Sequence, residues 1–292
     1  MADDGPSMIH SASDAAFEGP HVPVAVQRPV PDGDRARRTS SVLGLGTVKF
    51  GRNRNVRYPG GEGFALPSDR EIETLLDVAV ECGIRTLDTA PAYGAAEERL
   101  GKLLRTRRRD FFLVTKTGEE FADGKSRHDF TAAHTRMSVE RSLRRLNTDF
   151  LDCVLCHSGH DDVEVITRTA VLETLARLKE EGKIGAFGVS TYTVEGGRLA
   201  LDRCDAVMVA YNRAYTAQRA VIDAAYASRK LVFVKKGLAS GHVGDLGDVA
   251  DNIRFILGTP GVTTLLFGSI DPVNIRANAA ALTPDRAVGQ KP

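Results

Sequence analysis

Four polar residues are of the right types to move a proton to or from an oxygen atom: Asp88, Tyr93, Lys116 and His157. A free phenol has a pKa of about 10, and a neighbouring ammonium group favours its phenolate form. Lys116 could supply that ammonium to Tyr93, and Asp88 could hold Lys116 protonated and in place. His157 could orient a carbonyl oxygen by hydrogen bonding. These residues therefore predict carbonyl reduction, in which Tyr93 protonates the oxygen as a hydride reaches the carbon.

The stretches that carry these residues alternate between strand and helix patterns. Short apolar runs, typical of strands buried on both faces, are each followed by a segment with helical periodicity. Eight strand–helix pairs are predicted, at 41–50 with 68–83, 84–88 with 95–104, 111–116 with 130–146, 150–157 with 163–181, 184–190 with 194–203, 206–211 with 217–228, 231–236 with 249–257, and 263–268 with 272–282. Eight pairs favour an α/β fold, the closed (β/α)8 TIM barrel.

The barrel is predicted to form a single domain over residues 41–282. Residues 1–40 are predicted to be a flexible N-terminal segment with a short hairpin at 24–38 that turns at 31–34. Residues 283–292 are predicted to be a short C-terminal tail.

Active sites of such barrels lie at the carboxyl ends of the strands. Asp88, Lys116 and His157 each end a predicted strand, and Tyr93 lies in the loop after Asp88. We therefore expect the four side chains to converge on one rim. For each residue alone a structural role is the simpler interpretation, so a catalytic role is indicated only if all four side chains lie together.

Composition narrows the function classes. The 292 residues carry a net charge of +1, which gives no electrostatic basis for binding nucleic acid or an anionic membrane. No apolar stretch approaches the roughly 18–20 residues of a membrane span, and the N-terminus does not resemble a secretory signal. A cytoplasmic protein is expected, and no metal site is predicted.

The four cysteines lie in apolar segments, at Cys82, Cys153, Cys156 and Cys204, which fits reduced and buried thiols. Residues 153–157 match the C-x-x-C-H pattern of c-type haem attachment. Because this match lies inside a predicted buried strand, we do not expect haem.

Several motifs together resemble the aldo-keto reductase family. They are LGLGT near the start of the barrel, LDTAPAYGAAEERLG, LVTKTG, LDCVLCH, GKIGAFGVS and FGSIDPVNIRANAAAL. The resemblance covers nearly all of residues 41–282. It implies a nicotinamide cofactor bound in extended form across the barrel mouth, with Asp88, Tyr93, Lys116 and His157 as the catalytic tetrad.

The resemblance also implies where the cofactor binds. A strand end followed by a helix N-terminus near Asp271 can hold a phosphate on backbone N–H groups, and in the family this segment holds the adenosine phosphate end. The expected cofactor-binding residues are Gly46, Thr47, Ser190, Met208, Lys235, Lys236, Gly268, Ser269, Asn274 and Asn278. NADP(H) is expected more than NAD(H).

The chain departs from the family pattern at this cofactor site. Positions that often carry a basic residue for the 2′-phosphate are here Gly268, Ile270 and Asn274, so Arg276 would have to compensate or the preference would lean to NADH. Met208 stands where the family has a glutamine that binds the nicotinamide carboxamide. Val234 stands where the family often has a tyrosine stacked on the nicotinamide ring.

Two neighbouring lysines, Lys235 and Lys236, leave two interpretations open. They could meet the pyrophosphate or an acidic substrate, or one could be a rim residue and the other solvated.

The substrate is expected to be a small carbonyl or alcohol, and sugar-like carbonyls and small aldehydes both stay open. A polar or anionic substrate is compatible with the basic residues of the first long loop: Lys49, Arg52, Arg54 and Arg57. Segments 48–67, 158–162 and 237–247 are expected to form the pocket wall. A monomer is slightly favoured. Two alternatives stay open, a non-redox isomerase or dehydratase on the same scaffold and a cofactor-sensing regulatory subunit.

Overall fold

The computed structural model describes residues 25–26, 38–56 and 63–282. Eight parallel strands close into a barrel: β3 (Leu43–Gly46), β4 (Thr86–Asp88), β5 (Phe112–Thr117), β8 (Leu151–His157), β9 (Ile184–Ser190), β10 (Ala206–Ala210), β11 (Leu231–Lys235) and β12 (Thr264–Phe267). The strands neighbour one another in chain order, and β12 pairs with β3 to close the ring. The predicted single-domain (β/α)8 barrel is confirmed.

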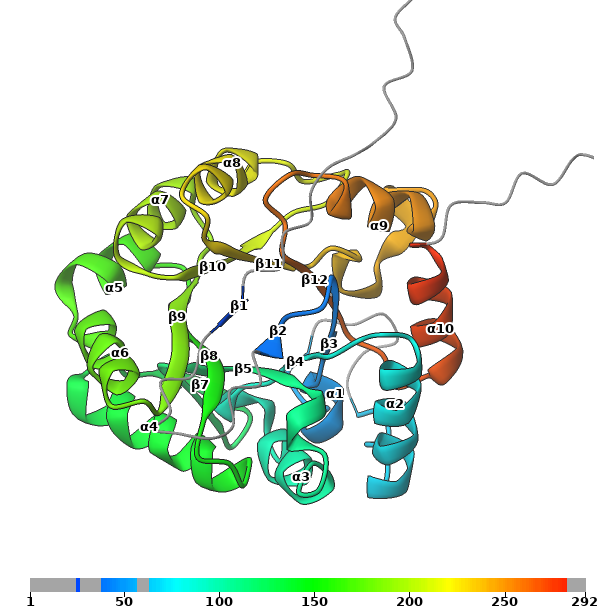
Figure 1. Ribbon diagram of the computed structural model, residues 1–292, viewed down its shortest axis with the longest axis horizontal. Coiled ribbons are helices and arrows are strands. Elements are labelled where there is room, and N and C mark those ends of the chain that lie inside the picture. The colour runs from blue at the N-terminus through cyan, green and yellow to red at the C-terminus, as the bar shows by residue number, and fades with distance from the viewer. Residues whose placement is uncertain (1–24, 27–37, 57–62, 283–292) are drawn as a thin grey trace, which may run out of the picture.

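Helices surround the ring of strands on its outer side (Figure 1). They are α2 (Asp69–Glu81), α3 (Ala96–Leu103), α4 (Ala132–Arg145), α5 (Asp162–Arg168), α6 (Val171–Glu180), α7 (Val194–Arg203), α8 (Arg219–Ala227), α9 (Val249–Leu257) and α10 (Pro272–Ala280). Short 3-10 turns lie at Pro91–Tyr93, Arg108–Asp110, Ala239–Gly241 and Val243–Leu246. The predicted start of the first long helix is confirmed, because Ser68 and Glu71 form a reciprocal capping box.

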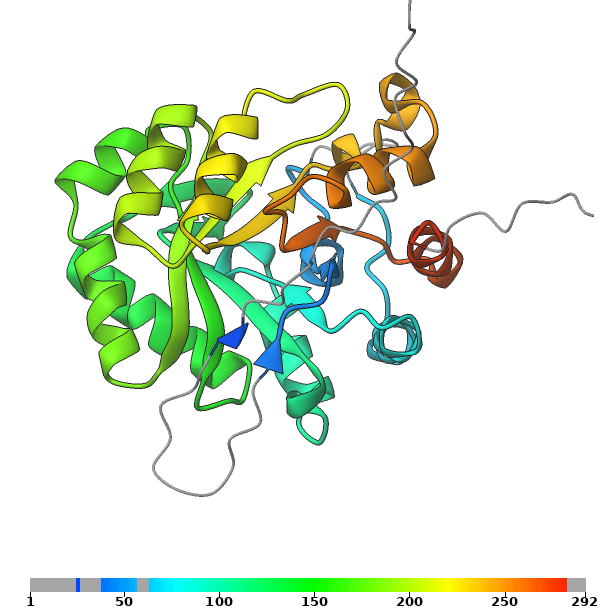
Figure 2. The same cartoon turned by 45° about the horizontal axis from the view of Figure 1, so that its top comes forward.

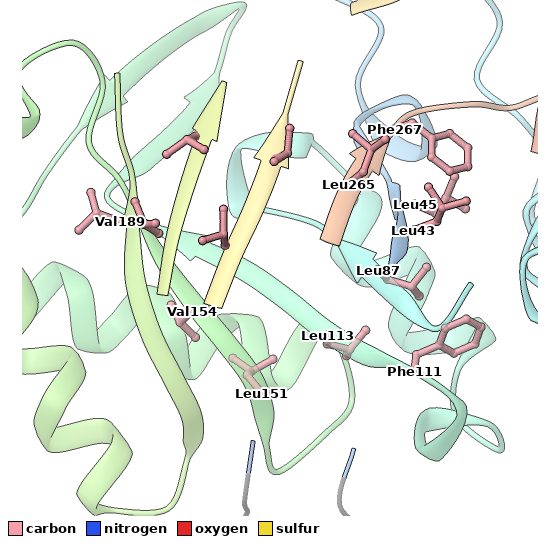
Figure 3. Packing of buried hydrophobic residues seen from close by; sticks show 14 of the residues in the cluster. Leu43, Leu45, Leu87, Phe111, Leu113, Leu151, Val154, Val189, Leu265 and Phe267 are labelled. Carbon is pink, nitrogen blue, oxygen red and sulfur yellow. The ribbon is translucent and has the colours of Figure 1, made fainter. Parts of the chain in front are cut away.

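In several strands, neighbouring residues enter two different apolar clusters. Leu113, Val154 and Val189 belong to the large cluster between the barrel and its helices (Figure 3). Their strand neighbours, such as Val114 and Leu155, form a small separate cluster. Since successive side chains of a strand point to opposite faces, the small cluster fills the barrel interior. Strand parity therefore tells which residues can reach the barrel mouth.

A two-residue strand pair lies at the end of the barrel where the strands begin. β1 (Ala25–Val26) pairs antiparallel with β2 (Arg38–Thr39), just before β3 starts, and Figure 2 shows both beyond the ring of strands. This pairing fits the predicted hairpin at 24–38. The turn expected at 31–34, most of the segment 1–40 and the tail 283–292 lie outside the described residues.

Two predicted elements were wrong in extent. The strand predicted at 41–50 ends at Gly46, and Val48–Gly51 forms the short helix α1 instead. The single helix predicted at 163–181 is divided into α5 and α6, because Thr169 is in an extended conformation. No glycine or proline marks this break, so periodicity alone could not reveal it.

One element was not predicted at all. Strands β6 (Glu119–Ala122) and β7 (Lys125–His128) form an antiparallel hairpin between β5 and α4. Its two-residue turn is Asp123-Gly124, and both residues have positive φ. An Asp-Gly pair with this geometry is a strong hairpin signal.

Over residues 25–26, 38–56 and 63–282, no helix is long and apolar enough to cross a membrane.

Candidate active site

A pocket of about 670 Å³ opens at the carboxyl ends of the strands. It is lined by all four predicted catalytic residues, Asp88, Tyr93, Lys116 and His157. It is also lined by nine of the predicted cofactor residues, Gly46, Ser190, Met208, Lys235, Lys236, Gly268, Ser269, Asn274 and Asn278. The sequence-based expectation that these residues share one rim agrees with their positions.

Lys116 is the most enclosed charged group of this pocket. It is 2% exposed, and its Nζ donates to Asp88 Oδ1 at 2.5 Å and to the Thr89 carbonyl oxygen at 3.0 Å. The same Nζ lies 5.1 Å from the centre of the Tyr93 ring. Parallel pairing of β4 with β5 sets this geometry, because it aligns Asp88 with Val114, two residues before Lys116. The ammonium thus lies beside the phenol, and its position is fixed by a buried carboxylate.

His157 has a partner that the sequence analysis missed. Its Nδ1 lies 2.5 Å from Oε2 of Glu119, the first residue of the hairpin β6–β7. Burial alone would raise the pKa of Glu119, but the hydrogen bond and charge of His157 lower it to about 2. The carboxylate is therefore ionised near neutral pH and places a negative charge beside Nδ1 of His157. Burial lowers the pKa of His157, and Glu119 opposes that shift.

The protonation state of His157 decides what it can do to a ligand. In the neutral ring with its proton on Nδ1, Nε2 is an acceptor and suits the hydroxyl of an alcohol. In the imidazolium both nitrogens donate, which suits a carbonyl oxygen. The signal that could have found Glu119 is the Glu119-Glu120 pair before the Asp123-Gly124 turn.

Replacing Glu119 by glutamine should lower the pKa of His157 further, because it removes the negative charge that favours the imidazolium. An NMR titration of the His157 ring, assigned with His157→Asn, measures this. Glu120→Gln is the matched control, since Glu120 pairs with Arg141 and His134 instead. An unchanged or raised midpoint in Glu119→Gln would show that Glu119 does not govern the ring.

Glycines open the far end of the pocket. A Cβ on Gly268 would meet only the Gly46 carbonyl oxygen, at 3.7 Å, and one on Gly46 would meet Phe267 at 3.5 Å. The packing of the protein itself therefore does not require glycine at these two positions. The space that a side chain would fill there is part of the pocket. The N-terminus of α10 lies beside it, capped by Asp271, whose side chain accepts from Val273 N–H. Remaining N–H groups and the helix dipole suit a phosphate.

Val234 occupies a position different from that expected, whereas Lys235 lines the pocket. Val234 is fully buried in the cluster facing the helices, so the interpretation that it lies where a nicotinamide would stack was wrong. Lys235 has the parity of Phe233, which points into the barrel, and it lines the pocket. Its Nζ donates to Ser190 Oγ at 2.8 Å. Lys236 is exposed at the rim.

Three further expectations are changed by the structure. Thr47 does not line the pocket, because it is buried and donates its N–H and Oγ1 to the Asp88 carbonyl oxygen. Arg276 pairs with Glu81 of α2 at 2.7 Å and is absent from the pocket lining. Arg52 binds the carbonyl oxygens of Ala92 and Asn55.

The wall comes from two of the three expected segments. Val48 and Lys49 contribute from the first, and four residues contribute from the third, Gly237, Leu238, Ser240 and Gly241. Segment 158–162 does not line the pocket, because Asp162 turns inward to bind the backbone of Tyr192 and Thr193. Arg57 lies outside the described residues.

The C-x-x-C-H match is a strand rather than a haem attachment site. Cys153 and Cys156 are fully buried in β8, and burial raises the pKa of both thiols. Among the residues described by the structure, no group of three or more histidine, cysteine, aspartate or glutamate side chains could hold a metal ion.

The fold and site define a (β/α)8 barrel protein whose mouth holds a pocket lined by Asp88, Tyr93, Lys116 and His157. Residues 42–227 match the model of the Aldo/keto reductase family, and the chain belongs to this family. A solved structure from Pseudomonas aeruginosa, assigned to the aldo-keto reductases, is 45% identical with a TM-score of 0.76. The match covers 88% of this chain and 96% of that one.

Curated relatives match over shorter stretches. The oxidoreductase YqkF of Bacillus subtilis is 32% identical over 157 residues, which cover 52% of this chain and 45% of the relative. D-arabinose 1-dehydrogenase of Saccharomyces cerevisiae is 34% identical over 137 residues, covering 44% of this chain and 39% of the relative. The chain thus spans less than half the length of these two relatives.

Proposed function

We propose that the chain is an oxidoreductase that moves a hydride between a nicotinamide cofactor and a carbonyl or alcohol carbon, with Tyr93 as the general acid and base. The observation that carries this proposal is the placement of Lys116, held by Asp88 at 2.5 Å and lying 5.1 Å from the Tyr93 ring in an open pocket. Family membership supports it.

Tyr93 provides the proton in the reduction direction. Its hydroxyl donates to the carbonyl oxygen as negative charge develops there, and the Lys116 ammonium stabilises the phenolate that remains. Asp88 keeps that ammonium in place. In the oxidation direction the phenolate accepts the alcohol proton, and neutral His157 can accept a hydrogen bond from the same hydroxyl.

A bound nicotinamide would donate or accept the hydride. The residues that fit such a cofactor are the open glycines Gly46 and Gly268, the N-terminus of α10 with Asn274, and buried Asn278. NADP(H) was expected from the sequence, but the segment 268–274 carries no basic residue and Arg276 is paired with Glu81 outside the pocket lining, which supports NAD(H) as the competitor.

The proposed substrate is a small polar carbonyl or alcohol. Lys49 lines the pocket, which supports a polar or anionic group on the substrate. The similarity to a D-arabinose 1-dehydrogenase makes the C1 hydroxyl of a sugar a class to include in a screen. A cytoplasmic location and a monomer stay predictions.

The test is a fluorescence titration of the purified protein with NADPH and NADH, followed by turnover with a panel of aldehydes, ketones and aldoses. Binding of one cofactor with reduction or oxidation of a panel member is the expected result. Binding without any turnover would favour a cofactor-sensing subunit. A lack of binding to either cofactor would overturn the proposal and favour the non-redox alternative.

A further inference from the structure

Lys235 brings a second ammonium group into the catalytic end of the pocket. It ends β11, and its Nζ lies 2.8 Å from Ser190 Oγ and 4.1 Å from the centre of the Tyr192 ring. Ser190 ends β9, two strands away, so the lysine side chain reaches across Met208 on β10. The ammonium therefore lies in the pocket beside Ser190, whose strand neighbours the one that carries Met208.

The surroundings of Lys235 are predominantly basic. Lys236 and Lys116 repel its charge, and Asp162 and Asp88 attract it. Both carboxylates are bound to other groups, Asp88 to Lys116 and Asp162 to backbone N–H groups at the start of α7. Burial, followed by the two lysines, lowers the pKa of Lys235 to about 7. The charge of Lys235 also contributes to lowering the pKa of His157.

The nicotinamide end of a bound cofactor must lie near this ammonium. This step rests on the proposed function. A hydride can pass only if the ring lies against the carbon whose oxygen would be held by Tyr93. Gly268 and the N-terminus of α10 would hold the phosphates at the other end. The pocket surface between these two ends includes Ser190, Met208 and Lys235.

We propose that Lys235 makes the site discriminate between the two redox states of the cofactor, with its ammonium donating a hydrogen bond to the carboxamide oxygen and disfavouring the oxidised ring. The oxidised nicotinamide ring carries a positive charge and the reduced ring carries none. A like charge a few ångströms away in an enclosed pocket is repulsive, so the reduced form should bind more tightly. Lys235 is a positioning and specificity residue in this proposal.

Affinities for the reduced and oxidised forms of the preferred cofactor test this inference directly. Fluorescence titration gives the affinity for the reduced form. Displacement of the reduced form by the oxidised form gives the affinity for the oxidised form. We define the ratio as the affinity for the reduced form divided by the affinity for the oxidised form. In Lys235→Met this ratio should fall by about tenfold or more relative to wild type at pH 6, because the repulsion of the oxidised ring is removed. Lys235→Arg keeps the charge and should keep the ratio.

The pH dependence has a defined sign. As pH rises from 6 to 9 the ammonium loses its proton, so the wild-type ratio should decline through about pH 7. The ratio in Lys235→Met should stay constant over the same range. Lys102→Met, which removes an exposed charge from α3, is the matched control and should behave as wild type.

The outcomes separate this inference from the proposed function. If wild type binds neither form, the nicotinamide proposal fails. If both forms bind but Lys235→Met keeps the wild-type ratio and its pH dependence, only the role of Lys235 is overturned. Should Lys235→Met fold poorly, Lys235→Gln removes the same charge, and a wild-type ratio in that variant contradicts the inference.

Discussion

Tyr93→Phe should reduce kcat/KM for carbonyl reduction by about 10²–10⁴-fold, because the oxygen then has no positioned proton donor. The affinity for the reduced cofactor should stay within about twofold of wild type, since the phenyl ring keeps its contact with the Lys116 ammonium. Steady-state kinetics and a fluorescence titration measure the two quantities independently.

A matched control distinguishes the acid from a structural tyrosine. Tyr215→Phe removes a hydroxyl from a side chain that is 43% exposed and outside the pocket lining, so turnover should be unchanged. Near-wild-type turnover in Tyr93→Phe would mean that another group, such as His157, supplies the proton.

Lys116→Met should both abolish measurable turnover and lower the free energy of unfolding by about 3–5 kcal/mol. The methionine fills a similar volume, but it leaves the Asp88 carboxylate buried without its cation, and an unpaired buried charge is costly. Urea unfolding at pH 7 measures the loss of stability.

The double variant Lys116→Met with Asp88→Asn separates the two effects. Removing both charges should restore most of the stability, because no uncompensated charge remains, while turnover stays absent. If the double variant is no more stable than Lys116→Met, the destabilisation arises from packing around position 116 and the ion pair is not its cause.

The barrel was predictable because its strands and helices differ in simple patterns. Runs such as TLLF in β12 are continuous and apolar, and helices such as α2 begin at a capping residue and bury one face. The meeting of Asp88, Lys116 and His157 followed from one topological rule about strand ends. Local patterns combined with one rule were therefore sufficient to predict that these side chains meet in one pocket, and their catalytic role stays a prediction.

Features that depend on tertiary contacts were not accessible in this way. The break between α5 and α6 has no local signal, and the contacts of Asp162 with Tyr192 and Thr193 link segments far apart in sequence. Val234 was placed at the stacking position because the face to which each residue of a strand points is not known until the strand's register is known. Glu119 was missed because its partner, His157, is 38 positions away in the sequence.

The hairpin β6–β7 supplies the carboxylate that holds His157, yet none of its residues belongs to the barrel sheet. Lys116 and Asp88, in contrast, are part of the strands that close the barrel. The barrel strands and the hairpin that sets the pKa of His157 are thus separate parts of the fold. Exchanging the thirteen-residue excursion between Thr117 and Thr131 for another would change the pKa of the imidazole while leaving the lysine and all eight barrel strands in place, so the loop offers a route to new pH optima on the same barrel.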